Sequence, residues 1–341
     1  MADNLDHPEK AIFGVAPAPP EHTLVDIINA TITDHPDVVA IEATEGSLTY
    51  AQLKDVLIEH AQRLHEHGVG RGSRVGIRVP SGTTDLYIAI LATIYAGAAY
   101  VPVDWDELDS RANTVWAEAQ VDADFGEDLF ITHPDHDPAE ENIPVDTTPP
   151  TLDDDAWIIF TSGSTGVPKG VAVSHRSAAA LVDSERLTYL ADAPLGPTDR
   201  VMAGLSVAFD ASCEEMWLAW RAGATLVTAS RDVVRSGDVL GQWIVDKRIT
   251  AVSTVPTLAA MWSEKSLEAV RLLIFGGEAC PPALVQRLSK PGREVWNTYG
   301  PTEATVIATA ELMDGTPPIR IGRPIPGWEL AVVDEHEEPV N

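Results

Sequence analysis

Short apolar segments alternate with amphipathic, helix-like stretches along most of this chain. The apolar segments include WIIF (157–160), ITAVSTV (249–255) and RLLIFGG (271–277), and each is short enough to be a buried strand. Strands that alternate with helices in this way are typical of parallel sheets covered by helices on their faces. A chain of 341 residues is long enough for two or three such units. The sequence therefore predicts an α/β protein with parallel sheets.

Residues 86–103, LYIAILATIYAGAAYVPV, carry no charge and approach the length of a membrane span. However, Gly97 interrupts the stretch, its end AYVPV is typical of a strand, and Asp104 follows directly. We therefore expect a buried helix followed by a buried strand, with no membrane contact. The N-terminus, MADNLDHPEK, lacks the basic and apolar regions of a signal peptide, so we expect a cytoplasmic protein.

The charge of the chain is strongly negative. Lys and Arg number 23 against 52 Asp and Glu, which gives a formal net charge of −29. Nucleic acids and anionic membranes are bound through clustered Lys and Arg, so neither is an expected partner. Asp and Glu residues are densest over residues 122–155, where we expect a solvated connecting loop rather than a metal site.

Residues 161–170, TSGSTGVPKG, form a loop of small residues directly after an apolar strand. Small residues let successive backbone N–H groups approach an anion, the hydroxyls add donors, and Lys169 adds a positive charge. We predict a polyphosphate-binding loop; the alternative is a simple Gly/Ser turn between two strands. The loop is not a P-loop, because it lacks the Gly immediately before the Lys and the Ser or Thr after it.

This loop resembles the signature loop of the adenylate-forming superfamily, specifically of the amino-acid adenylation domains of nonribosomal peptide synthetases. The resemblance covers residues 22–341. Four further segments resemble other motifs of that family and occur in the family's order: LTYAQL (48–53), LATIYAGAAYVPVDW (91–105), AFDASCEEMW (208–217) and NTYGPTEATV (297–306). Members of the family join a carboxylate to the α-phosphate of ATP, release pyrophosphate, and pass the acyl group to a thiol. The resemblance implies this activity, with ATP and Mg²⁺, for the present chain.

The resemblance also implies the architecture, which is two packed α/β subdomains in αβαβα layers and the start of a β-barrel. We expect an N-terminal loop (1–21), a first subdomain (66–199), a second subdomain (22–65 with 200–310) and an incomplete barrel (311–341). In the family a small mobile C-terminal domain follows and carries the ribose-binding Asp, the hinge and a catalytic Lys. The motifs of that domain are absent from this sequence.

The resemblance assigns the nucleotide contacts residue by residue. Lys169, Thr302 and Glu303 are the expected catalytic residues, with Thr302 at the α-phosphate and Glu303 holding Mg²⁺, a cation that prefers carboxylate and phosphate oxygens. Tyr299 is expected to stack on adenine. The complete expected ATP site comprises Thr161, Ser162, Gly163, Ser164, Thr165, Gly166, Lys169, Gly277, Glu278, Ala279, Asn297, Tyr299, Gly300 and Thr302.

The amino-acid pocket is assigned in the same way. Asp210 matches the family's residue for the substrate α-ammonium, and the expected pocket comprises Phe209, Asp210, Ala211, Glu214, Ser253, Ile274, Gly276, Thr298, Val306 and Ile307. Asp210 and Glu214 are four residues apart, so on a helix they share one face. Two ammonium groups on one substrate would relieve the repulsion between them. The alternatives are that Asp210 only caps its helix, that Glu214 is a solvated helix acid, and that Glu215 faces solvent or a core partner.

These residues predict L-lysine as the substrate, with ornithine next and arginine third. The set also resembles lysine-activating adenylation domains, including those of synthetases that make lysine homopolymers. A carrier protein whose phosphopantetheine lies outside this chain is the expected partner. Two other functions stay open: an acyl- or aryl-CoA synthetase, which Asp210 argues against, and a nucleotide- and amino-acid-binding module with little turnover.

Overall fold

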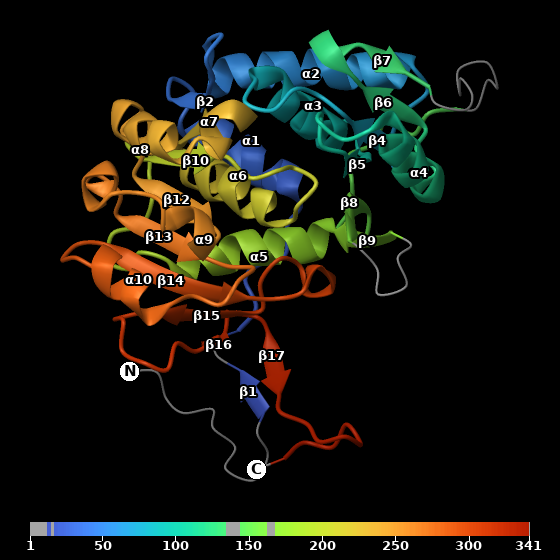
Figure 1. The fold of residues 1–341 in the computed structure, drawn as a ribbon. Helices are drawn as coiled ribbons and strands as arrows, with labels where there is room; N and C mark the ends of the chain where they lie inside the picture. The colour runs from blue at the N-terminus through green and yellow to red at the C-terminus, as the bar shows by residue number, and fades with distance from the viewer. Residues whose placement is uncertain (1–11, 15–16, 134–143, 162–167, 341) are drawn as a thin grey trace.

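The computed structural model describes residues 12–14, 17–133, 144–161 and 168–340, and two large sheets form its frame (Figure 1). The six-stranded sheet has the order β7-β6-β4-β5-β8-β9. Its four central strands are parallel, and the edge strands β7 and β9 are antiparallel to their neighbours. The strands are β4 (Arg74–Ile77), β5 (Ala99–Pro102), β6 (Ala123–Phe125), β7 (Ile131–Thr132), β8 (Asp155–Thr161) and β9 (Lys169–Ser174).

The nine-stranded sheet has the order β16-β15-β14-β13-β12-β10-β11-β2-β3. Its six inner strands are parallel: β14 (Glu294–Tyr299), β13 (Leu272–Phe275), β12 (Ala251–Thr254), β10 (Arg200–Ala203), β11 (Thr225–Thr228) and β2 (Val39–Glu42). The outer strands are antiparallel: β3 (Ser47–Thr49), β15 (Thr309–Leu312) and β16 (Arg323–Pro324). The sheet thus unites segments from both halves of the chain.

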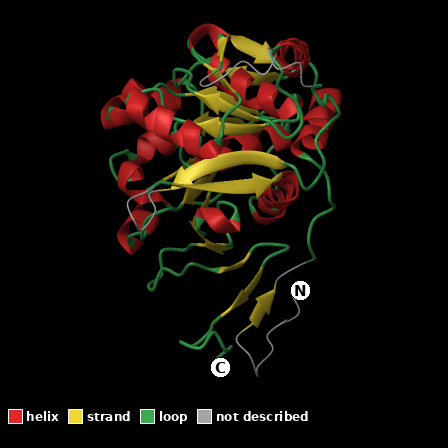
Figure 2. Cartoon of the chain, turned by 90° about the vertical axis from the view of Figure 1, so that its right-hand side faces the viewer, coloured by secondary structure: helices red, strands yellow, loops and turns green. Residues whose placement is uncertain are grey.

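Helices form three layers around the two sheets (Figures 1 and 2). The central layer shares one apolar core with both sheets and contains α1 (Leu24–Asp34), α2 (Tyr50–Glu66), α3 (Thr84–Tyr95), α5 (His175–Thr188) and α6 (Ala211–Ala222). The outer face of the six-stranded sheet is covered by α4 (Asp109–Ala119). The outer face of the nine-stranded sheet carries α7 (Arg231–Arg235), α8 (Gly237–Asp246), α9 (Pro256–Ala259) and α10 (Pro282–Leu288). The predicted αβαβα layering is confirmed.

The inner strands are apolar throughout because successive side chains enter two different apolar cores, one on each face of the sheet. In β10, Val201 and Ala203 belong to the central core, whereas Met202 between them belongs to the outer core. In β13, Ile274 likewise faces the centre and Leu273 the outer helices. Strands buried on both faces are continuous apolar runs rather than alternating ones, because successive side chains point to opposite faces of the sheet.

The uncharged stretch 86–103 folds as predicted, into a buried helix (α3) followed by a buried strand (β5). The helix residues from Leu86 to Ile94 are all buried. Within the described ranges, no helix combines the length and the apolar character needed to cross a membrane.

The two ends of the chain differ from the expectation. Residues 12–14, which we expected in a loop, form β1 (Ile12–Gly14) and pair antiparallel with β17 (Glu329–Ala331). The expected boundary at 310 falls inside β15, and β16 continues the nine-stranded sheet. A strand of three residues has too little periodicity to be predicted, and its partner lies more than 300 residues away in the chain. A β-barrel around this pair and the division into subdomains stay predictions.

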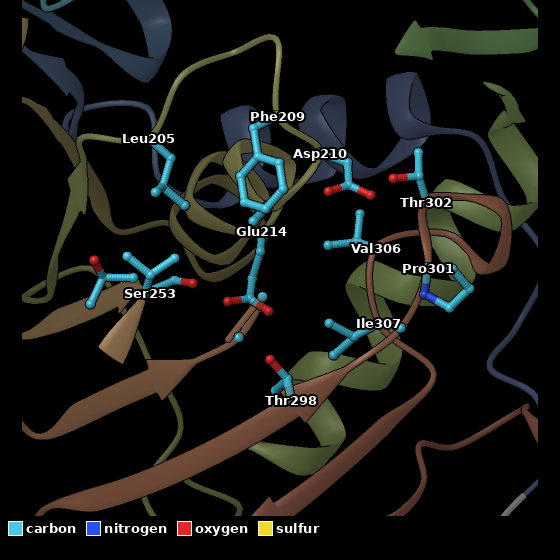
Figure 3. Close-up of a pocket in the computed structure, with 16 residues that line it drawn as sticks. Leu205, Phe209, Asp210, Glu214, Ser253, Thr298, Pro301, Thr302, Val306 and Ile307 are labelled. Carbon is cyan, nitrogen blue, oxygen red and sulfur yellow. The ribbon is translucent and has the colours of Figure 1, made fainter. Parts of the chain in front are cut away.

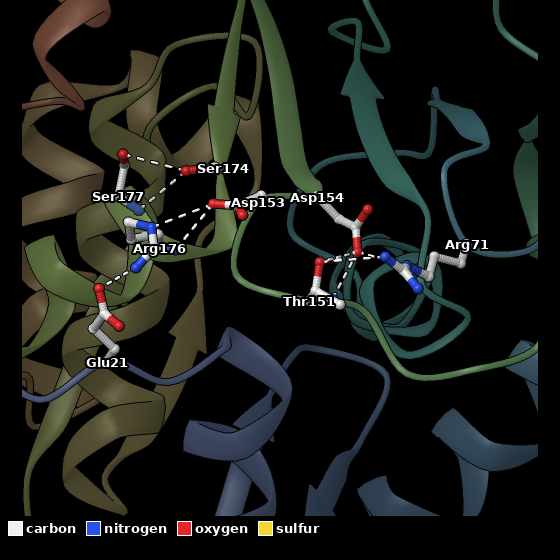
Figure 4. Close-up of polar contacts among 8 residues, drawn as sticks. All are labelled: Glu21, Arg71, Thr151, Asp153, Asp154, Ser174, Arg176 and Ser177. Carbon is white, nitrogen blue, oxygen red and sulfur yellow. Dashed lines mark hydrogen bonds and ion pairs between the residues drawn. The ribbon is translucent and has the colours of Figure 1, made fainter.

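Polar contacts fix the start of α5 (Figure 4). The Ser174 hydroxyl caps the helix by accepting the backbone N–H of Ser177 at 3.3 Å. The Arg176 guanidinium pairs with Asp153 at 3.0 Å and also with Glu21. Such exposed pairs contribute at most about 1 kcal/mol each. Together they connect the first turn of α5 to the segment before β8 and to the N-terminal segment.

Candidate active site

A cavity of about 160 Å³ opens where β12, β13 and β14 end and α6 begins (Figure 3). In open α/β sheets, ligands bind outside the carboxyl ends of the parallel strands. Sixteen residues line this cavity: Leu205, Phe209, Asp210, Ala211, Glu214, Ser253, Thr254, Val255, Gly276, Gly277, Thr298, Gly300, Pro301, Thr302, Val306 and Ile307. The structure therefore brings together nine of the ten expected substrate residues, and Gly277, Gly300 and Thr302 of the expected ATP residues.

The tenth expected substrate residue, Ile274, does not line the cavity. Its side chain is fully buried in the core between the sheets, two residues before Gly276, which follows β13. Sequence reasoning missed four other lining residues, which lie at strand or loop ends: Leu205, Thr254, Val255 and Pro301.

Two glycines of the cavity lining lie too close to neighbouring atoms to carry a side chain. A Cβ at Gly276 would lie 2.8 Å from the Thr298 hydroxyl oxygen, and one at Gly300 would lie 2.6 Å from the backbone N of Ala308. Real side chains do not tolerate such distances, so both positions need glycine. Thus β14 packs closely against its neighbours at the cavity floor.

Asp210 lies directly before α6 and is only 6% exposed. Its side chain makes no capping hydrogen bond to the helix, so the interpretation of Asp210 as a mere helix cap is wrong. Burial raises the pKa of the Asp210 carboxyl, while the Thr302 side chain and the backbone of Ala211 favour its charged form. Figure 3 shows this carboxylate beside the side chain of Thr302. An ammonium group could bind there.

Glu214 lies one helical turn further into the cavity, close to Ser253 and Thr298 (Figure 3). The side chain is 2% exposed, so it is not a solvated helix acid. Its Oε1 has no hydrogen-bond partner among the described residues. Burial raises the pKa of Glu214 to about 7, although the side chains of Ser253, Glu185 and Tyr189 partly lower it. A buried carboxyl with an unused oxygen is costly unless a partner arrives.

Glu215 is equally buried but faces away from the cavity. Its carboxylate accepts the backbone N–H groups of Gly204 at 3.1 Å and of Leu205 at 3.0 Å. Of the two expectations for Glu215, solvent or a core partner, the second is therefore confirmed. This residue holds the loop that follows β10.

Two further residues lie behind Glu214 and were missed from the sequence. Glu185 on α5 is 1% exposed, and neither of its carboxyl oxygens has a hydrogen-bond partner within the described ranges. Tyr189 follows α5 directly, and its buried hydroxyl also has no hydrogen-bond partner among the described residues. The sequence does contain a signal for them, because Leu181 and Glu185 share one helical face at a spacing of four and Tyr189 follows at the same spacing, just past the end of α5.

The expected adenine-side residues adjoin lining residues in the sequence. Tyr299 ends β14 and is 53% exposed, and Asn297 donates its side-chain amide to the Arg320 carbonyl at 2.7 Å. Glu278 accepts the backbone N–H of Thr257 at 3.2 Å. Ala279 is exposed beside it. These residues do not line the cavity itself.

The expected phosphate loop joins two antiparallel strands. Thr161 ends β8 and pairs with Lys169, which begins β9. Ser162, Gly163, Ser164, Thr165 and Gly166 lie outside the described residues. Strand β9 contacts the short turn Thr302–Ala304, so the base of the loop lies beside the cavity mouth.

Glu303 is the expected Mg²⁺ ligand and is exposed in that turn, close enough to Asp210 to raise the pKa of its carboxyl. The described ranges contain no group of three or more His, Cys, Asp or Glu side chains arranged to hold a metal ion. Mg²⁺ is commonly bound by one or two carboxylates together with substrate phosphates. A single exposed carboxylate beside the expected phosphate loop fits that mode of binding.

The two-sheet core with a cavity at the strand ends defines the N-terminal subdomain of the adenylate-forming fold. The chain is similar to the crystal structure of the nonribosomal peptide synthetase FmoA3, with a TM-score of 0.81, 27% identity, and coverage of 95% of this chain and 36% of that one. The N-terminal subdomain of NpsA from Klebsiella oxytoca shares the fold, with a TM-score of 0.78 and 23% identity over 94% of this chain and 84% of that one. The family model described as "AMP-binding enzyme" matches residues 28–341, and the chain belongs to this family.

Curated relatives include much larger synthetases. The chain is 39% identical over 92% of its length to a probable non-canonical nonribosomal peptide synthetase, CymA, of Salinispora arenicola. It is 34% identical over 92% of its length to the delta-poly-L-ornithine synthetase of Acinetobacter baumannii, and 38% identical over 89% to a linear gramicidin synthase of Brevibacillus parabrevis. The chain spans only 4%, 24% and 6% of these relatives, respectively.

Proposed function

We propose that this domain activates an amino acid with a second amino group, lysine first and ornithine next, as an aminoacyl-adenylate with release of pyrophosphate. The observation that carries the proposal is one cavity lined by both Asp210 and Glu214, in which the Glu214 Oε1 has no hydrogen-bond partner among the described residues. The α-ammonium would pair with Asp210 and the distal ammonium with Glu214. The remaining lining residues are mostly small or aliphatic, such as Ala211 and Val306, and suit a methylene chain.

The geometry also supports the chemistry. An α-ammonium held at Asp210 leaves the substrate carboxylate near Thr302, on the side of the cavity that adjoins the phosphate loop. In-line attack on the α-phosphate requires that both reactants be held in one orientation. Lys169 would neutralise charge on the leaving pyrophosphate, and Glu303 would hold Mg²⁺, which would supply further positive charge beside the phosphates. The aminoacyl group would then pass to the phosphopantetheine thiol of a carrier protein.

One relative supports a diamino acid as the substrate, because it is named as a synthetase of poly-L-ornithine. Ornithine and lysine differ by one methylene group, which is worth only about 1–3 kcal/mol of discrimination. Both substrates therefore belong in the test.

Pyrophosphate exchange by the full-length protein tests the proposal. Lysine, ornithine, arginine, norleucine and benzoate are compared at equal concentration. We expect lysine or ornithine to exceed norleucine roughly tenfold or more, because only they supply a charged partner for Glu214. Exchange with benzoate but not with lysine or ornithine would favour an aryl-activating enzyme instead. Nucleotide binding without exchange would favour a binding module.

A further inference from the structure

The loop between β10 and α6 carries three residues of the cavity lining: Leu205, Phe209 and Asp210 (Figure 3). The backbone of this loop turns at Ser206, whose carbonyl oxygen accepts the backbone N–H of Phe209 at 2.9 Å. The Ser206 hydroxyl oxygen also accepts the backbone N–H of Ala208 at 3.3 Å. The placement of Phe209 and Asp210 therefore depends on how Ser206 is held.

Asp104 holds Ser206 from the other sheet. This residue lies just after β5 of the six-stranded sheet and is 7% exposed. The Ser206 hydroxyl donates to Asp104 Oδ2 at 2.5 Å. The same oxygen accepts a hydrogen bond at 2.5 Å from the guanidinium of Arg231, which begins α7 on the outer face of the nine-stranded sheet. One buried carboxylate thus joins the loop to elements of both sheets.

The two sheets are in close contact beside Asp104. Gly82, between β4 and α3, lines the same small cavity as Asp104 and Arg231. A Cβ at Gly82 would lie 2.6 Å from the Cα of Ser230, so the backbones touch there. The hydroxyl of Thr228, the last residue of β11, donates to the Gly82 carbonyl at 2.6 Å. This packing fixes the position of Asp104 relative to the nine-stranded sheet.

Two carboxylates therefore hold consecutive residues of the loop. Glu215 accepts the backbone N–H groups of Gly204 and Leu205, and Asp104 accepts the hydroxyl of the next residue, Ser206. Hydrogen bonds to ionised groups are about twice as strong as those between neutral groups. Asp104 does not line the substrate cavity, and Leu205 lines both that cavity and the small one beside Asp104. Asp104 can thus act on the substrate only through the loop.

We propose that Asp104 is a positioning residue of the amino-acid site, which holds the loop through Ser206 in the form that presents Phe209 and Asp210 to the substrate. This inference rests on the proposed function, in which Asp210 binds the α-ammonium group. A displaced Asp210 weakens the binding of every amino acid, so lysine and norleucine lose the same factor. The expected ATP residues belong to other segments of the chain, so the KM for ATP changes little.

The test measures pyrophosphate exchange by Asp104→Ala and Ser206→Ala in the full-length protein, with lysine, ornithine and norleucine. We expect kcat/KM for each accepted amino acid to fall about ten- to hundredfold, mainly through a higher KM for the amino acid. The double variant should lose little more than either single variant, because both changes remove the same hydrogen bond. Asp104→Asn keeps a carbonyl oxygen that can take the place of Oδ2, so it should restore most of the loss.

Asp106→Ala is the matched control. Asp106 also pairs with α7, with Arg235 at 3.1 Å and with Arg231 at 3.8 Å, but it is more exposed than Asp104. Its removal leaves the bond between Asp104 and Ser206 in place, so both KM values should stay near those of the wild type. A loss as large as that in Asp104→Ala would assign the effect to the contact with α7 and overturn the inference.

The outcomes separate two failures. If the wild-type protein exchanges with none of the three amino acids, the proposed function fails and this inference with it. If the wild type does use one of them, the inference alone is overturned by an unchanged amino-acid KM in Asp104→Ala, by an equal rise in the KM for ATP, or by losses that add in the double variant. A folding defect lowers the amount of active enzyme, and so the apparent kcat, without raising the KM for the amino acid.

Discussion

Glu214 and Glu215 are neighbours on α6 and are both almost fully buried, yet their carboxyl groups meet opposite surroundings. Glu215 receives backbone N–H groups from the loop after β10. Glu214 points into a cavity, and its Oε1 has no partner among the described residues. The helix separates them because adjacent residues face different sides. A satisfied buried acid stabilises the fold, whereas an unsatisfied one in a cavity indicates a site for a positively charged ligand.

The comparison also distinguishes the two acids that do share the cavity. Asp210 lies beside Thr302, and Glu214 reaches toward Ser253 and Thr298 (Figure 3). In the proposed assignment, Asp210 binds the α-ammonium group, which every amino-acid substrate carries. Glu214 binds the distal ammonium group, which only diamino acids carry. Substitutions can test each assignment separately.

The largest effect is expected for Asp210→Asn. Removing one partner of a buried charge pair costs about 2–5 kcal/mol, and every amino-acid substrate carries the α-ammonium. Pyrophosphate exchange with lysine and with norleucine should therefore fall by the same large factor, and their ratio should stay constant. A selective loss of lysine exchange would show that Asp210 binds the distal group instead.

A smaller effect, on stability rather than specificity, is expected for Glu215→Ala. This change leaves the backbone N–H groups of Gly204 and Leu205 without their acceptor. The free energy of unfolding should fall by about 2–4 kcal/mol, measured by urea denaturation, because each orphaned buried donor costs about 1–3 kcal/mol. The lysine-to-norleucine ratio of the folded fraction should not change. Normal stability with an altered ratio would reverse the roles assigned to the two glutamates.

The smallest effect is expected for Lys169→Ala at the base of the phosphate loop. Lys169 is exposed, so its charge contributes on the order of 1 kcal/mol to nucleotide affinity. ATP should lose more affinity than AMP in calorimetric titrations, because only ATP has the outer phosphates. Equal losses for both nucleotides would contradict the assignment.

Much of this picture follows from local sequence patterns. The alternation of apolar segments with helical stretches predicts the layered α/β fold, and the interrupted apolar stretch 86–103 predicts α3 and β5. The four-residue spacing of Asp210 and Glu214 predicts that both reach one cavity. Each of these inferences depends only on residues that are close together in the chain.

The features that were missed depend on distant contacts. The pairing of β1 with β17 joins opposite ends of the chain, and neither strand has more than three residues. Glu185 becomes buried only because α5 packs on α6 and the central core. Ile274 fits the family pattern but is covered by the central core. Sequence spacing carries no information about which helices meet, so these findings needed the structure.

The central claim is that Glu214 binds the distal ammonium of the substrate. Its most direct test is the ratio of kcat/KM for lysine to that for norleucine in Glu214→Gln, measured by pyrophosphate exchange in the full-length protein. We predict that the ratio falls roughly a hundredfold relative to wild type, since a buried charge pair loses one partner worth about 2–5 kcal/mol. An unchanged ratio would contradict the account.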